Sequence, residues 1–135
     1  MTRTRLKDKR ILITGASHGI GQQTAVLLAA RGAQLTIVAR SSNVLAELSH
    51  DIAQAGGKAY PLVADLTDAR SRTGIVDRAV EWMGGLDLLV NVAGHSPFGP
   101  FEAETDAELE TLVGLNVLAP MQLSRAAVKQ FKSQG

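Results

Sequence analysis

Four short apolar runs constrain the fold of this 135-residue chain more than any other feature of its sequence. They cover residues 11–14, 35–38, 59–63 and 86–92, and their apolar residues mostly follow one another instead of alternating with polar ones. Continuous apolar strands are typical of a parallel sheet that is buried on both faces. We therefore expect parallel strands, which require crossover segments between them.

Helical patterns fill the stretches between these runs. Apolar residues recur there at helical spacing, and glycines such as Gly32 stop the patterns. Asp68 is the expected N-cap of the third helix, and a capping-box sequence at Thr105 begins the fourth. The expected helices cover residues 20–31, about 44–52, 75–83 and 105 to about 133. This alternation predicts an α/β fold with helices on both faces of the sheet.

The position of Pro61 indicates which strand lies at the edge. Proline has no N–H group, so a strand that contains it belongs at a sheet edge. Pro61 lies in the third run, which is an edge strand in the order 3-2-1-4. We expect one Rossmann-type, doubly wound domain over residues 1–135, with a sheet in this order that stops before a fifth strand.

Composition argues against several classes of partner. Fourteen Lys and Arg against 13 Asp and Glu give a net charge of +1, and the aromatic residues are one Trp, one Tyr and three Phe. A nucleic-acid surface would need a larger basic excess and more stacking side chains. No apolar run reaches the length of a membrane span, and the chain has no Cys. We expect no nucleic-acid, membrane or metal partner, and a cytoplasmic location.

A glycine-rich turn, Thr14 to Gly21, joins the first expected strand to the first helix, with its glycines spaced GxxxGxG. Gly15 permits the sharp turn, Gly19 lets a pyrophosphate approach the backbone, and Gly21 lets the helix pack close to the strand. Amides of the first helical turn would face the phosphates, helped by the helix dipole. The turn predicts a dinucleotide site; the alternative is a merely tight turn.

The end of the second strand indicates which dinucleotide binds. A carboxylate there would favour NAD by binding the ribose hydroxyls, but the stretch from Gly21 to Ala46 has no Asp or Glu. Arg40 follows the strand instead, and a guanidinium can bind a 2′-phosphate through charge-assisted hydrogen bonds. Ser41 can add a hydroxyl donor. We therefore expect NADP, with a solvated strand-end arginine as the alternative.

Three further motifs, together with the glycine turn, resemble those of the short-chain dehydrogenase/reductase family. They are Asp65-Leu66-Thr67-Asp68, Asn91-Val92-Ala93-Gly94 and Asn116-Val117. The four motifs stand in the family's order at similar spacing, and the resemblance covers essentially the whole chain. It implies a nicotinamide-dependent oxidoreductase that acts on a small carbonyl or alcohol substrate.

The resemblance also implies individual roles. The glycine turn, including Ser17, His18 and Ile20, would hold the pyrophosphate. The loop with Asp65 and Leu66 would contact adenine through the Asp65 carboxylate. The motif at residues 91–94 would support the sheet and border the adenosine ribose, with Asn91, Ala93 and Gly94 as the residues that match the family. Val92 departs from the family, which usually has a second asparagine there.

Asn116 resembles the family's catalytic asparagine, whose backbone carbonyl holds a water linked to the catalytic lysine. Pro120 lies four residues later and lacks the N–H group that would bond to this carbonyl in a regular helix. We therefore expect a free carbonyl and a kinked helix. The alternative is an ordinary proline kink beside a buried, satisfied asparagine.

The family's chemistry needs a serine and a YxxxK pair. The single tyrosine here is Tyr60, and Ala64 stands four residues later. We interpret the chain as the cofactor-binding half of a longer, NADP-dependent oxidoreductase. The alternatives are a non-catalytic dinucleotide-binding module that is complete at this length, and an unrelated doubly wound binding protein.

We also expect a homo-oligomer. In the related enzymes the fourth helix packs against its copy in a second subunit, and a fourth strand without a neighbour would leave an open edge. The apolar residues of this helix exceed what one sheet face covers; they are Leu109, Leu112, Val113, Leu115 and Leu118.

Overall fold

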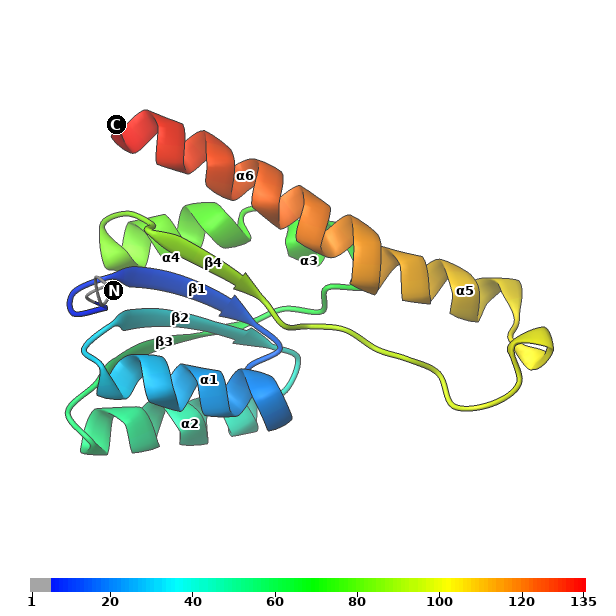
Figure 1. Cartoon of the computed structure of the whole chain (residues 1–135), viewed down its shortest axis with the longest axis horizontal. Helices are drawn as coiled ribbons and strands as arrows, with labels where there is room; N and C mark the ends of the chain where they lie inside the picture. The colour runs from blue at the N-terminus through cyan, green and yellow to red at the C-terminus, as the bar shows by residue number, and fades with distance from the viewer. Residues whose placement is uncertain (1–5) are drawn as a thin grey trace, which may run out of the picture.

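The computed structural model describes residues 6–135 and contains a four-stranded parallel sheet (Figure 1). Its strands are β1 (Arg10–Thr14), β2 (Gln34–Ala39), β3 (Lys58–Val63) and β4 (Leu88–Asn91). They lie in the order β3-β2-β1-β4, with every pair parallel. The predicted order and the edge position of Pro61 are confirmed.

Helices cover both faces of the sheet, as predicted. Figure 1 shows α1 and α2 on one face and α4 and α6 on the other. The helices are α1 (Gly19–Ala30), α2 (Ser42–Gln54), α3 (Ala69–Arg72), α4 (Ile75–Met83), α5 (Asp106–Val113) and α6 (Ala119–Gln134). A 3-10 turn (Phe101–Ala103) and a π-helical turn (Gly114–Leu118) complete the helical segments.

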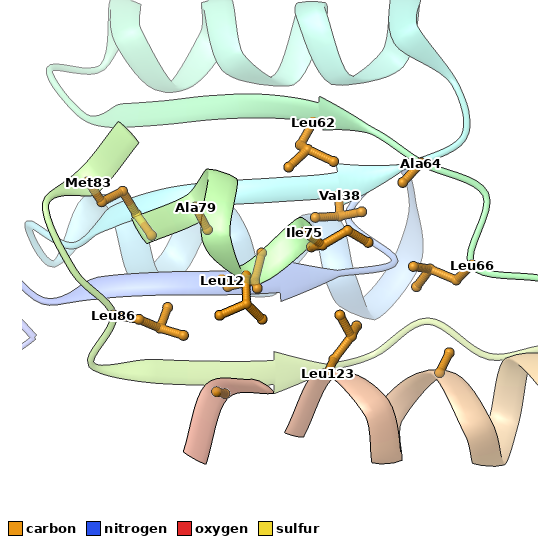
Figure 2. Close-up of a cluster of buried hydrophobic side chains, with 13 residues drawn as sticks. Leu12, Val38, Leu62, Ala64, Leu66, Ile75, Ala79, Met83, Leu86 and Leu123 are labelled. Carbon is orange, nitrogen blue, oxygen red and sulfur yellow. The ribbon is translucent and has the colours of Figure 1, made fainter. Parts of the chain in front are cut away.

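Successive strand residues point to opposite faces and fill two separate cores. Ile11 and Ile13 belong to the core under α1 and α2, whereas Leu12 belongs to the core under α4 and α6, beside Ile75 and Leu123 (Figure 2). All three β1 side chains are fully buried. This two-sided burial explains why the central strands are continuous apolar runs.

The region expected to form one helix capped by Asp68 contains two helices. The Asp68 carboxylate accepts hydrogen bonds from the Arg70 and Ser71 amides, so it caps the short α3. The chain then turns through Gly74, which has a positive φ of 77° and is the N-cap residue of α4. The prediction of Asp68 as the cap of α4 was wrong, because periodicity does not reveal a left-handed residue between two helices.

The expected fourth helix begins at its predicted cap. Thr105 and Glu108 form a reciprocal capping box. The helix is not regular, because Ala119 N–H donates to the Gly114 carbonyl five residues earlier in a π turn. This turn immediately precedes Pro120, and α6 continues to Gln134. The distortion expected near Pro120 therefore takes the form of a π turn.

Candidate cofactor-binding site

A cavity of about 370 Å³ lies where the strands end, between the β1–α1 turn, the loops after β2, β3 and β4, and the α5–π segment. Carboxyl ends of parallel strands are where ligands bind in open α/β sheets. The cavity brings together most of the site residues predicted from sequence: Gly15, Ser17, His18, Arg40, Asp65, Leu66, Ala93 and Gly94. The other predicted residues, Gly19, Ile20, Gly21, Ser41, Asn91 and Asn116, are outside its lining.

The three glycines of the turn differ in what surrounds them. A Cβ atom on Gly15 would lie 2.7 Å from the Ala93 amide nitrogen, and a Cβ atom on Gly21 would overlap the Gly15 carbonyl. A Cβ atom on Gly19 would meet nothing within 4 Å. Gly15 and Gly21 are therefore required by the protein's own packing. Open space at Gly19 fits a phosphate approaching the backbone.

The N-terminus of α1 has no capping side chain. Its N-cap residue is His18, which makes no side-chain cap hydrogen bond; its Nδ1 lies 2.8 Å from Ser17 Oγ. Ser41 caps α2 and Thr105 caps α5. The first amides of α1 thus have no side-chain acceptor in the described part of the chain, and an anion satisfies such amides. This arrangement fits the pyrophosphate of a dinucleotide.

Arg40 is exposed at the end of β2, and its side chain makes no hydrogen bond to any of residues 6–135. The cavity thus has an unused guanidinium on its wall. Ser41 is engaged differently, since its Oγ accepts the Val44 amide at 3.4 Å and caps α2. Its hydroxyl hydrogen is still available to a ligand.

Asp65 is held by Thr67. Its Oδ1 accepts hydrogen bonds from the Thr67 hydroxyl at 2.7 Å and from the Thr67 amide at 3.0 Å. These bonds, with a smaller contribution from the charge of Arg40, hold the pKa of Asp65 below its ordinary value. No hydrogen bond from residues 6–135 reaches Oδ2. The carboxylate is therefore fixed, ionised near neutral pH, and able to accept from a ligand donor.

The loop after β4 depends on two side chains from distant parts of the chain. Thr14 Oγ1 accepts the Val92 and Ala93 amides, each at 3.2 Å. Asn116 Oδ1 accepts the His95 amide at 2.9 Å, and its Nδ2 donates to the His95 carbonyl. Sequence reasoning missed both roles, because the partners lie 78, 79 and 21 residues apart.

Two predicted asparagines lie beside the cavity lining and make side-chain contacts of their own. Asn91 Nδ2 donates to Ser124 Oγ of α6 at 3.3 Å. Asn116 is exposed, so the alternative of a buried asparagine was wrong; the side chain is satisfied by His95 instead. Its close approach to Gly94, where a Cβ atom would lie 2.9 Å from Asn116 Oδ1, explains the need for glycine there.

Two kinds of feature are absent from the described residues. Within residues 6–135, no three His, Cys, Asp or Glu side chains gather in a way that could hold a metal ion. None of the helices in this part of the chain has the length and apolar character needed to cross a bilayer.

Comparison with known proteins agrees with this geometry. The short chain dehydrogenase family model matches residues 9–135. An uncharacterized oxidoreductase of Thermotoga maritima is 39% identical over 129 residues, which are 96% of this chain and 51% of that protein. The chain thus spans about half the length of the curated relatives it matches.

Solved structures give the same result. A short chain dehydrogenase of Burkholderia cenocepacia in complex with NADP is 36% identical with a TM-score of 0.88, over 94% of this chain and 52% of that one. A 7α-hydroxysteroid dehydrogenase complexed with NADH and 7-oxo glycochenodeoxycholic acid is 29% identical with a TM-score of 0.92, over 100% of this chain and 54% of that one. By sequence and by fold, this chain belongs to the short chain dehydrogenase family of oxidoreductases.

Proposed function

We propose that this chain provides the NADP(H)-binding part of an oxidoreductase that interconverts small alcohols and carbonyl compounds. The observation that carries the proposal is Arg40, a guanidinium on the cavity wall at the end of β2 that pairs with none of residues 6–135. The preceding residue is Ala39, and no acidic residue occurs between Gly21 and Ala46. The end of β2 therefore offers positive charge where a 2′-phosphate would lie, and the stretch around it from Gly21 to Ala46 supplies no carboxylate.

The remaining site residues support the same assignment. The amides after His18 would bind the pyrophosphate, with Ser17 and Ile20 beside them and with space at Gly19 for the approach. Asp65 Oδ2 would accept from the adenine amino group, beside Leu66. Ala93 and Gly94 would border the adenosine ribose, on a loop that Thr14 and Asn116 hold in place. When bound, the cofactor would supply or accept the hydride.

Asn116 has a positioning part in this proposal. Its side chain fixes the His95 backbone. Its carbonyl lies within the π turn that precedes Pro120, and we propose that this carbonyl orders a water for the proton transfer. Asn91 would support the site through Ser124.

Calorimetry with NADPH and NADH tests the cofactor assignment. Arg40→Ala should weaken NADPH binding about tenfold or more, because a hydrogen bond to a charged group contributes roughly 1.5–3 kcal/mol. NADH affinity should stay nearly unchanged. Arg31→Ala is a matched control, since it removes an exposed arginine at the other end of α1. Equal losses for both cofactors would overturn the 2′-phosphate assignment.

The chemistry of the chain itself can be tested by turnover. A carbonyl that accepts hydride develops negative charge on oxygen and needs a positioned proton donor. Tyr60 lies on edge strand β3 and stacks near Trp82, with ring centroids 6.1 Å apart. We therefore expect residues 1–135 to oxidise no NADPH with any carbonyl substrate. Turnover that survives Tyr60→Phe would show that another group supplies the proton.

We also propose that the protein self-associates through the α5–α6 face and acts in the cytoplasm. Val113, Leu118 and Met121 are exposed there, at 49%, 43% and 64% of their surface. Apolar side chains gathered on one exposed face mark an interaction surface. Light scattering should show dimers or larger species at high concentration, and a monodisperse monomer would contradict this part of the proposal. Cell fractionation tests the location.

A further inference from the structure

Arg72, the last residue of α3, carries a buried charge that the proposed function does not use. Only 8% of its surface is exposed, and it is the one ionisable side chain buried among residues 6–135. Arginines are almost never buried without a partner. No carboxylate of the described residues forms a salt bridge with it. The hydrogen bonds of its guanidinium go instead to the dipoles of neutral acceptors, and the charge of Asp68 acts on it from nearby.

Those dipoles come from two separate elements. Arg72 Nη1 donates to the Leu66 carbonyl at 2.7 Å and to the Thr67 carbonyl at 3.3 Å. Its Nε donates to Gln122 Oε1 on α6 at 2.7 Å. Hydrogen bonds from an ionised donor are stronger than neutral ones. One guanidinium thus joins the loop after β3 to the helix on the α4 side of the sheet.

The loop that Arg72 holds is the one that carries Asp65. Leu66 and Thr67 line the cavity together with Asp65. Thr67 binds Asp65 Oδ1 through its amide and its hydroxyl. Because Arg72 holds the Leu66 and Thr67 carbonyls, it also holds Thr67 in place. Thr67 in turn holds the Asp65 carboxylate. The position of Asp65 Oδ2 therefore depends indirectly on Arg72, through Thr67.

We propose that Arg72 is a positioning residue for the adenine end of the cofactor site, because it clamps the Asp65–Thr67 loop to α6. That the ligand contains adenine rests on the proposed function, whereas the clamp itself is a property of the unliganded protein. A role in stability alone would affect the whole fold. The clamp predicts an effect that is confined to residues 65–68 and to ligands that contain adenine.

The chain offers a matched pair of variants on one short helix. Arg72→Met replaces the guanidinium with an unbranched apolar side chain in a buried place, and Arg70→Met makes the same change at an exposed position whose side chain bonds to none of residues 6–135. In the unliganded protein, Arg72→Met should speed amide hydrogen exchange about tenfold at residues 65–68 and leave β1 and β2 unchanged. Arg70→Met should change neither. The proposed clamp is wrong if residues 65–68 of Arg72→Met exchange at the wild-type rate. It is also wrong if exchange increases equally throughout the chain.

Affinity for adenosine 2′,5′-bisphosphate, measured by calorimetry, tests the functional half of the proposal. Arg72→Met should weaken it about tenfold, the change expected from loss of one charge-assisted contact, and Arg70→Met should not. If the wild-type protein binds this probe and Arg72→Met binds it equally well, the positioning role is wrong and the proposed function stands. If the wild-type protein does not bind it, the proposed function fails.

A milder variant covers the case in which Arg72→Met does not fold. Gln122→Met removes only the acceptor on α6 and leaves the guanidinium on the loop carbonyls. Gln122→Met should speed amide hydrogen exchange at residues 65–68 and weaken the affinity for adenosine 2′,5′-bisphosphate, each by about threefold. Wild-type values for both quantities would overturn the proposal.

Discussion

The two ends of the sheet use their polar groups in opposite ways. At the amino end, Arg10 donates from Nε and Nη2 to the Asp87 carboxylate and from Nη1 to the Gly84 carbonyl. Gln134 binds both the amide and the carbonyl of Leu86. At the carboxyl end, Arg40, the first amides of α1 and Asp65 Oδ2 have no such partner among residues 6–135.

The difference distinguishes groups that hold the fold from groups that have no partner among residues 6–135 and that we propose bind a ligand. Both ends contain an arginine and an aspartate within electrostatic reach of each other. Arg10 and Asp87 satisfy one another, whereas Arg40 and Asp65 remain apart. Because unpaired polar groups are costly unless water or a ligand meets them, their concentration at one end supports the proposal that a ligand binds there.

The largest effect should come from Gly21, where the carboxyl end depends on close packing. Gly21→Ala would force a Cβ atom into the Gly15 carbonyl and should destabilise the protein by about 3 kcal/mol. Gly19→Ala is the matched control, because its Cβ atom meets open space and costs only about 1 kcal/mol for the left-handed backbone. Urea unfolding measures both.

These two glycine variants also separate folding from binding. Gly19→Ala should weaken NADPH binding about tenfold while the protein stays folded, since its methyl group would occupy the space left for the phosphates. If Gly19→Ala binds NADPH normally, the open space there has no role in cofactor binding.

The second effect should come from the ion pair at the amino end. The hydrogen bonds and charge of Arg10 lower the pKa of Asp87 from 3.8 to about 2. Both side chains are about one quarter exposed, so we expect Asp87→Asn to cost about 1–2 kcal/mol at pH 7. A group whose pKa falls on folding stabilises the protein above its unfolded pKa. The difference should therefore be full above about pH 4 and shrink as the pH falls toward 2.

Urea unfolding at several pH values measures this dependence. Arg10→Met should remove the same pH-dependent part of the stability, and the double variant should show coupling. Neither variant should alter NADPH affinity at pH 7, because both residues lie at the end remote from the cavity. A change in affinity would break the distinction between the two ends.

The smallest effect should come from Gln134. Gln134→Ala removes the amide that meets Leu86 N and O at 2.8 and 2.7 Å, and it should cost about 1 kcal/mol. Lys132→Ala, an exposed neighbour on α6, should cost less than about 0.5 kcal/mol. Equal costs, measured by thermal unfolding, would show that the contact to Leu86 adds nothing.

The sequence predicted those parts of the molecule that local patterns encode. Continuous apolar runs gave the strands, Pro61 gave the edge, and the glycine spacing located the turn whose crowding at Gly15 and Gly21 the structure explains. The capping box at Thr105 was equally readable, because its partners lie three residues apart.

The parts that could not be predicted depend on long-range contacts or on the sign of φ. Gly74 separates α3 from α4 through a left-handed backbone that no periodicity reveals. Arg72 follows a polar stretch that indicates a solvated helix, yet its contacts with Leu66 and Gln122 bury it. Thr14 and Asn116 hold the loop after β4 across many intervening residues.

Titration of the ¹⁵N-labelled protein with NADPH, followed by amide chemical shifts, tests the contrast between the two ends most directly. The account predicts the largest shifts at residues 15–21, 40–41, 65–67 and 93–95, at the carboxyl ends of the four strands. Amides at Arg10, Gly84, Leu86 and Asp87 should keep their positions. Shifts centred on these amino-end residues, or no shifts with saturating NADPH, would contradict the assignment of the cofactor site.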